Sequence, residues 1–154
     1  MTSLYLVDGQ GILVLYRMGS KIVDKLYVGS AGGHFEKDEL SDARACVLRE
    51  MEEELGLKES DVADLKLRYI TLRLKNGEIR QNYYFFGRLV EPKALTSNEG
   101  RLEWYPYEAM ETLPMPVSAR FMMDHYLAAG RFTEELYAGI TTEQGISFEA
   151  LREF

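Results

Sequence analysis

Residues 32–57 read GGHFEKDELSDARACVLREMEEELGL, and this stretch decides most of what the sequence predicts. Its second half gathers one arginine and four glutamates within six consecutive positions: Arg49, Glu50, Glu52, Glu53 and Glu54. The apolar residues around them recur at helical spacing, and Gly56 follows as a helix stop signal. Like charges one helical turn apart repel each other, so a helix this acidic calls for a bound cation.

The sequence predicts that this helix begins at Ser41 as its N-cap, with Asp42 in the first turn. Its expected apolar face consists of Ala43, Val47, Leu48, Met51 and Leu55. At about 100° per residue, Glu50, Glu53 and Glu54 project together from the other side. Three carboxylates beside a glycine-rich backbone supply the hard oxygen ligands that magnesium prefers. On the carboxylates alone, a solvated glutamate-rich helix face is the alternative.

The remaining segments alternate between strand-like and helical patterns. The predicted strands are 4–7, 12–17, 26–28, 65–74, 79–90 and 101–105, followed by a final pair around 139–145. Asn76-Gly77 indicates a hairpin, and 18–25 is a polar loop. A single helical turn is expected over 107–110, and a second helix from Ser118 as N-cap to about Ala129. Interleaved elements of this kind indicate the α+β class with a mixed sheet, in one domain over 1–154.

Composition excludes several classes of protein. The chain has 154 residues and a formal charge of −7, which argues against a general nucleic-acid-binding surface. No apolar run approaches the roughly 20 residues of a membrane span, so no membrane association is expected. The single cysteine, Cys46, excludes an internal disulfide and favours a reducing compartment, with the cytoplasm as the expected location.

Residues 49–57, REMEEELGL, resemble the second half of the Nudix box, which reads R-E-U-x-E-E-x-G-U with U an aliphatic residue. Gly33, five intervening residues and Glu39 are similar to the first half of the box, and Gly32 completes its glycine pair. The whole helical half matches.

The first half of the box departs from the family pattern in two places. Nine residues separate Glu39 from Arg49, where the box has seven, which a two-residue insertion before the helix would explain. Glu36 or Asp38 could therefore take the place of Glu39. The proline that often precedes the glycine pair is replaced by Ala31.

The resemblance implies an α/β/α sandwich with a mixed β-sheet and hydrolysis of a nucleoside diphosphate linked to another group X. It makes Glu53 and Glu54 the principal magnesium ligands, with Glu50 and the carbonyl of Gly33 completing the set. It also implies that Arg49 orients a glutamate through a charge-assisted pair, with Glu39 as the expected partner. Mg²⁺ is the expected cofactor and Mn²⁺ its alternative.

The resemblance also implies that a glutamate on a loop well after the box can contact the metal or act as the base, a position that Glu99 occupies, so Glu53 or Glu99 is the expected general base. Glu99 lies in Ser97-Asn98-Glu99-Gly100, which reads equally well as a plain polar turn. The small single-domain members that this chain resembles are often nucleoside triphosphate pyrophosphohydrolases, including those that clear oxidised purine nucleotides such as 8-oxo-dGTP. ADP-ribose, a dinucleotide or a nucleotide sugar is the alternative substrate, and a non-catalytic nucleotide-binding module is the alternative class. Either a monomer or a homodimer is compatible with the sequence.

No residue that would bind the nucleoside could be assigned. The rings of residues 83–86, YYFF, alternate between the two faces of a strand, so two of them could stack on a base, although Phe85 and Phe86 favour the core. Arg17, Lys25, Arg73 and Arg80 could contact phosphates, but each stands alone in the sequence, and Arg73 between two leucines is expected to face outward.

Overall fold

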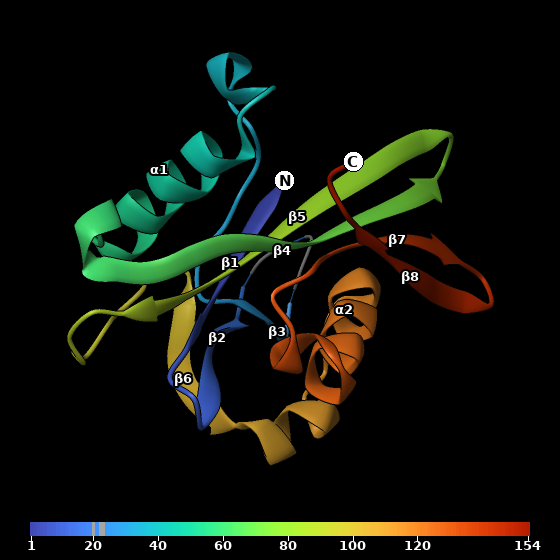
Figure 1. The fold of residues 1–154 in the computed structure, drawn as a ribbon. Coiled ribbons are helices and arrows are strands. Elements are labelled where there is room, and N and C mark those ends of the chain that lie inside the picture. Colours follow the sequence, from blue (N-terminus) through green and yellow to red (C-terminus); the bar gives the residue numbers. More distant parts are fainter. Residues whose placement is uncertain (20, 22–23) are drawn as a thin grey trace.

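The computed structural model describes residues 1–19, 21 and 24–154 and shows a mixed β-sheet between two helices, α1 (Ala43–Leu55) and α2 (Val117–Ala128) (Figure 1). The strands are β1 (Thr2–Val7), β2 (Gly11–Arg17), β3 (Leu26–Gly29), β4 (Val62–Lys75), β5 (Glu78–Leu89), β6 (Gly100–Pro106), β7 (Leu136–Thr142) and β8 (Gly145–Leu151). Short 3₁₀ helices are η1 (Lys37–Glu39), η2 (Glu59–Asp61), η3 (Tyr107–Thr112) and η4 (Gly130–Phe132). The predicted α+β class and sandwich are confirmed.

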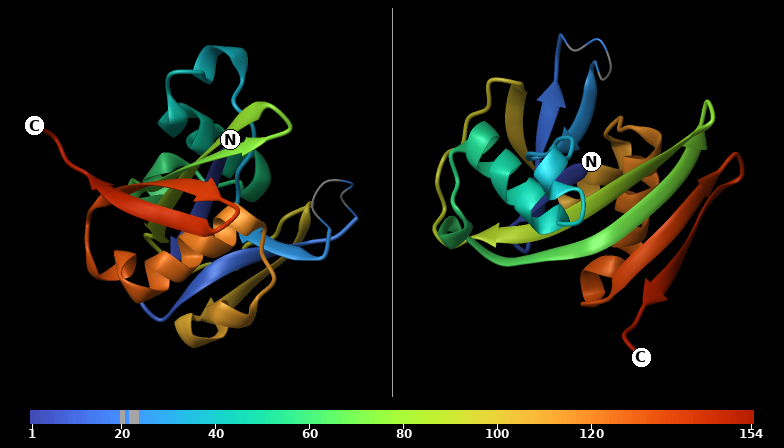
Figure 2. Two further views of the ribbon diagram at one scale, coloured as in Figure 1. Left: turned by 90° about the vertical axis from the view of Figure 1, so that its right-hand side faces the viewer. Right: turned by 90° about the horizontal axis from the view of Figure 1, so that it is seen from above.

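The strands are ordered β3-β2-β1-β5-β4-β7-β8. Strand β6 lies outside this order and pairs with β2 along its whole length. The β1–β5 and β4–β7 pairs are parallel, and the other strand pairs are antiparallel, so the sheet is mixed as predicted. Figure 2 shows the β4–β5 and β7–β8 hairpins reaching past the helices at one end of the sheet.

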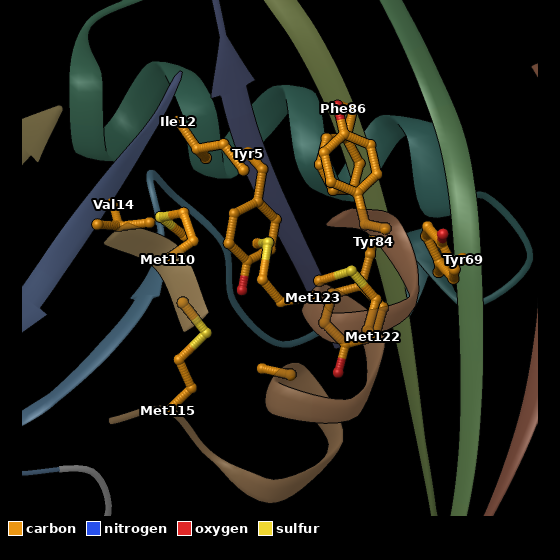
Figure 3. Packing of buried hydrophobic residues seen from close by; sticks show 12 residues of the cluster. Tyr5, Ile12, Val14, Tyr69, Tyr84, Phe86, Met110, Met115, Met122 and Met123 are labelled. Carbon is orange, nitrogen blue, oxygen red and sulfur yellow. The ribbon is translucent and has the colours of Figure 1, made fainter. Parts of the chain in front are cut away.

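Strand alternation sends neighbouring side chains to opposite helices. On β1, Leu4 and Leu6 pack toward α1, whereas Tyr5 packs toward α2. On β5, Phe85 faces α1, and Tyr84 and Phe86 face α2, as Figure 3 shows for the α2 side. The α1 cluster also contains Val47, Met51, Leu55, Leu57 and Leu65, and the α2 cluster contains Met110, Met115, Met122, Met123 and Tyr126. The core interpretation of Phe85 and Phe86 is therefore confirmed.

Turn chemistry explains the long central hairpin. Asn76 and Gly77 both take left-handed backbone conformations, with φ of 53° and 77°, as a two-residue β-hairpin turn demands. The turn joins β4 to β5 in antiparallel register, with Leu74 opposite Ile79. The final strand pair around 139–145 is also confirmed, as β7 and β8.

Both predicted helix starts are wrong by one or two residues. The N-cap of α1 is Asp42 rather than Ser41, because the Asp42 side chain accepts the N–H of Ala45 at 2.9 Å. Helix α2 begins at Val117 after Pro116, and Ser118 lies buried inside its first turn without capping it. Proline fixes a backbone angle suited to a helix start, which is how the chain turns there without a side-chain cap.

The expectation that Arg73 faces outward is also wrong. Arg73 is half-buried on the α2 side of the sheet, whereas its neighbour Leu74 is 71% exposed on the other side. The polar loop predicted over 18–25 includes residues 20, 22 and 23, which lie outside the described residues. Within the described part of the chain, no helix is long and apolar enough to cross a membrane.

Candidate active site

The outer face of α1 carries the glutamates of the predicted site. Cys46, Val47, Met51 and Leu55 of the same helix are buried. Glu52 and Glu53 are exposed, whereas Glu50 and Glu54 are partly buried against the glycine loop. Gly56 ends the helix with φ of 66°, and its N–H donates to the carbonyl oxygen of Glu52 at 2.9 Å. A left-handed residue at this position favours glycine, which has no Cβ to clash.

Arg49 is the hub of the charged network on this face. Its guanidinium donates two hydrogen bonds to Glu39, from Nε to Oε1 at 2.6 Å and from Nη2 to Oε2 at 3.0 Å. Its Nη1 also donates to Glu50 at 2.9 Å and to Glu53 at 3.0 Å, and Nη2 donates to the carbonyl of His34 at 3.0 Å. One cation therefore holds three carboxylates in place. The expected pairing with Glu39 is present, and Glu36 is more distant, at 4.0 Å.

Glu39 is buried beside this guanidinium, and the pairing changes its protonation. Hydrogen bonds from Arg49, followed by the backbone bond within the η1 turn, lower the pKa of Glu39 to about 2. The same contact raises the pKa of Arg49. Despite the two extra residues before the helix, the side chain of Glu39 thus reaches Arg49.

The glycine pair brings backbone close to the carboxylates. A Cβ at Gly32 would lie 2.3 Å from the carbonyl oxygen of Thr2, which excludes any larger residue. A Cβ at Gly33 would lie 2.3 Å from a carboxylate oxygen of Glu50, so only glycine leaves room for that side chain as it stands. The carbonyl oxygen of Gly33 already accepts the N–H of Thr2 at 2.8 Å, and its expected role as a metal ligand stays a prediction.

Glu54 is the carboxylate with the most unusual environment. Its Oε2 accepts the N–H of Gly32 at 2.9 Å. Burial raises the pKa of Glu54 to about 7, and the nearby charges of Glu99 and Glu50 add to that rise, whereas the Gly32 bond and Arg17 oppose it. Three carboxylates thus influence one another around the glycine loop.

Glu99 comes from the loop before β6 and is brought to this cluster from far along the chain. Its carboxylate is ion-paired with Arg17, at the end of β2, where Arg17 lies opposite Gly100 in the β2–β6 register. The sequence singled out Glu99 by its distance after the box, but it listed Arg17 only as an isolated basic residue. No local signal could have paired them, because the contact depends on how β6 aligns with β2.

The residues present fit a divalent cation by their chemistry. Glu54 is pushed toward neutrality by burial and, to a smaller extent, by two neighbouring carboxylates, and a bound cation would restore its charge. In the described residues, however, no three His, Cys, Asp or Glu side chains converge closely enough to hold a metal ion as they stand. Glu53 and Glu99 are instead engaged by arginines.

Two cavities in the described part of the chain lie away from the box glutamates. A cavity of about 340 Å³ is lined by residues that include Val7, Arg88, Lys93 and Trp104, and none of the box glutamates contributes to it. A second cavity of about 320 Å³ adjoins it around Val90 and Pro92. Neither lies at the carboxylates, so the chemistry of the side chains rather than cavity volume locates the candidate active site.

The comparisons with known proteins agree with this geometry. The family model of the NUDIX domain matches residues 2–126, and the chain belongs to the Nudix family. It is a Nudix pyrophosphohydrolase that acts on nucleotide derivatives.

Several solved structures share the fold. The mutator MutT protein of Bacillus halodurans is 23% identical, with 97% of this chain and 95% of that chain covered and a TM-score of 0.64. The Ap4A hydrolase of C. elegans is 14% identical over 82% of this chain and 92% of that chain, with a TM-score of 0.63. The NUDIX domain of Shewanella oneidensis NrtR, complexed with ADP ribose, is 13% identical over 86% and 85%, with a TM-score of 0.59. Among curated proteins no match was found.

Proposed function

We propose that this chain hydrolyses a nucleoside triphosphate to a nucleoside monophosphate and pyrophosphate, with Mg²⁺, or Mn²⁺ in its place, as the cofactor. One observation carries the assignment of the site: Glu54 accepts the N–H of Gly32 and Glu50 lies against Gly33, and burial, together with the nearby charges of Glu99 and Glu50, raises the pKa of Glu54 to about 7. Glu50, Glu53 and Glu54 would hold the cation.

The bound cation would neutralise the pyrophosphate and lower the pKa of a water molecule. The protein's own groups supply the rest. The N–H of Gly32 fixes the Glu54 carboxylate, and Arg49 orients Glu50 and Glu53 from the same helix. Glu53 or Glu99 would accept the proton of the water that attacks phosphorus, and the bridging oxygen would leave with the expelled product, which is pyrophosphate after attack on the α-phosphorus and the nucleoside monophosphate after attack on the β-phosphorus.

Either base must first lose an arginine partner. Glu53 bonds to Arg49, which keeps Glu39 and Glu50 as partners when Glu53 turns away. Glu99 pairs with Arg17, whose guanidinium would then be free to face a substrate phosphate. An active site of this kind rearranges when substrate arrives, which is common for catalytic contacts in the free enzyme.

The triphosphate is the preferred substrate because the likeness to a mutator MutT protein extends over nearly the whole of both chains. An oxidised purine nucleotide such as 8-oxo-dGTP is one member of that class. ADP-ribose, a dinucleotide or a nucleotide sugar is the second candidate, since an Ap4A hydrolase and an ADP-ribose-bound NUDIX domain share the fold. We further propose that the protein acts in the cytoplasm, as a monomer or homodimer, without a nucleic-acid partner.

The test is product analysis by chromatography with purified protein and magnesium. The panel contains ordinary and oxidised nucleoside triphosphates, ADP-ribose, NADH, UDP-sugars and dinucleoside polyphosphates. We expect nucleoside monophosphate and pyrophosphate from a triphosphate, and no product from Glu53→Gln protein prepared in the same way. Activity on a diphosphate derivative alone would overturn the triphosphate assignment. Nucleotide binding without turnover of any panel member would favour a non-catalytic module.

A further inference from the structure

Near the turn of the β4–β5 hairpin, apolar side chains are exposed and an arginine side chain is half-buried, which is the reverse of the usual arrangement. On the α1 side of the sheet, Leu74 and Ile79 lie opposite each other and are 71% and 75% exposed. On the α2 side, Arg73 is half-buried, although arginine is among the residues least often found inside proteins. A solvated strand would be expected to turn its arginine to the solvent instead. The α2 side of this hairpin therefore has a polar interior that the fold alone does not require.

Arg73 lies directly opposite Arg80 in the β4–β5 register, so two guanidinium groups extend from one face of neighbouring strands. Like charges in this position destabilise a sheet. Arg80 has only a loose ion pair with Glu78, at 3.7 Å, and both side chains are more than half exposed. Among the residues that the structure describes, Arg73 has no carboxylate within 4.0 Å. The repulsion is thus compensated only by this loose ion pair of Arg80, in a protein whose net charge is −7.

Two buried hydroxyl groups next to this pair also lack partners. Thr71, two residues before Arg73 and on the same face, is 1% exposed, and in the described structure its hydroxyl has no partner that meets the distance and angle of a hydrogen bond, although it is close enough to the Tyr84 hydroxyl to lower the pKa of that group. Thr141 of β7 lies beside Arg73 in the parallel register, and its hydroxyl oxygen is likewise buried and unpaired. A buried hydroxyl without a partner costs about 1–3 kcal/mol, which is unusual to find twice in one place.

Further polar groups border the same place. Asn82 lies opposite Thr71 on β5. Burial raises the pKa of Tyr84, and the neighbouring Thr71 and Asn82 side chains oppose that rise, so the Tyr84 hydroxyl also faces this part of the sheet. Two guanidinium groups together with hydroxyl and amide donors make up the set that recognises a phosphate oxygen cluster.

We propose that Arg73, Arg80, Thr71 and Thr141 form a binding site for a phosphate group, separate from the metal-binding carboxylates of α1. Its distance from them follows from the strand register. Tyr83 lies opposite Thr2, whose N–H bonds to Gly33, and Arg80 lies three residues further along β5, which is about 10 Å of strand. The phosphate belongs either to a distant part of the substrate or to a separate anion.

The site is tested by calorimetric titration in EDTA, which removes any contribution from a metal-loaded active site. The probes are adenosine, AMP and adenosine 3′,5′-bisphosphate, which differ only in their phosphates. We expect affinity to rise with each phosphate in the wild-type protein. In the Arg73→Gln/Arg80→Gln double variant, we expect the bisphosphate to lose at least about tenfold in affinity, since charge-assisted bonds are lost. Arg101→Gln, an exposed arginine on β6, is the matched control and should bind as the wild type does.

A second variant separates binding from folding. Because the Thr71 hydroxyl has no partner, we expect Thr71→Val to unfold at the same urea concentration as the wild type or a higher one, and yet to bind the bisphosphate more weakly. The double arginine variant should likewise be no less stable without phosphate, since it removes a repulsion. Equal affinity of the wild type for all three probes, or unchanged bisphosphate binding in both variants, would overturn the site.

Turnover assays distinguish the two sources of the phosphate. If the phosphate is part of the substrate, the double variant raises KM and leaves kcat unchanged. If it is a separate anion, KM stays unchanged without added phosphate, and added inorganic phosphate alters the rate of the wild type only. Both results support the site. Since the binding measurements need no turnover, a failure of the proposed hydrolysis would be recognised independently.

Discussion

At the scale of single residues, the charges of the candidate active site fall into two groups with opposite protonation behaviour. Glu39 is held ionised by Arg49, and Glu54 is pushed toward its neutral form by burial and by other carboxylates. The difference arises from the partners: one carboxylate meets a guanidinium, and the other meets a backbone N–H and two like charges. A helix with this many glutamates can thus keep a firm ion pair at Arg49 and a carboxylate close to neutrality at Glu54 within two turns.

The Glu39 pair predicts a loss of stability in acid. Its pKa is about 2 in the folded protein and 4.5 without partners, so its contribution is complete above pH 4.5 and disappears as the pH falls toward 2. In urea unfolding at about pH 7 and about pH 3, Glu39→Gln should lose less stability on acidification than the wild type. Glu52→Gln, an exposed glutamate of the same helix, is the control and should lose as much as the wild type. Equal acid sensitivity of Glu39→Gln and the wild type would contradict the pairing.

Glu54 predicts that magnesium affinity depends on pH near neutrality. Its pKa of about 7 in the metal-free protein means that a proton competes with the cation below that pH. Magnesium should therefore bind more tightly at about pH 8 than at about pH 6, as measured by calorimetry. In Glu54→Gln the affinity should be weaker, and its change with pH should be smaller. An affinity that is independent of pH in the wild-type protein would argue against Glu54 as a ligand.

At the scale of elements, the sequence predicted the strands and helices well and their ends less well. Periodicity located α1, and Asn76-Gly77 located the β4–β5 turn, because both signals are local. Which of two adjacent capping residues is used depends on backbone angles that neither residue determines alone, and so Ser41 was preferred wrongly over Asp42. The pairing of Arg17 with Glu99 and the half-buried Arg73 depend on strand register, which no single segment encodes.

The corrected N-cap of α1 is testable by stability. Asp42→Ala should lower the free energy of unfolding by about 1 kcal/mol, because the N–H of Ala45 loses its acceptor. Ser41→Ala should change it by less than about 0.5 kcal/mol. Urea unfolding of the two variants side by side distinguishes the two positions. A larger loss in Ser41→Ala than in Asp42→Ala would restore the prediction made from the sequence.

At the scale of the whole molecule, one sheet supports both helices and the candidate site. Strand β1 buries Leu4 against α1 and Tyr5 against α2, so each face of the sheet depends on the same backbone. We propose that the chain is one domain, with the candidate active site on the α1 side of the shared sheet and the phosphate site on its α2 side.

A single domain predicts a single unfolding transition. Trp104, the only tryptophan, reports through its fluorescence on the surroundings of β6, and far-ultraviolet circular dichroism reports on the backbone as a whole. The two signals should give the same urea midpoint. Two separated midpoints would show that the chain unfolds in parts, and would contradict the assignment of one domain.

The most direct measurement of the central claim is kcat/KM with magnesium for Glu54→Gln and Glu52→Gln, using whichever nucleotide the wild-type protein hydrolyses. The two glutamates belong to the same helix, but only Glu54 lies against Gly32 beside Glu50 and Glu99. We expect Glu54→Gln to lose a factor of roughly 10²–10⁴ and Glu52→Gln to stay close to the wild type. Equal activity in the two variants, with both folded, would contradict the assignment of this helix face as the catalytic metal site.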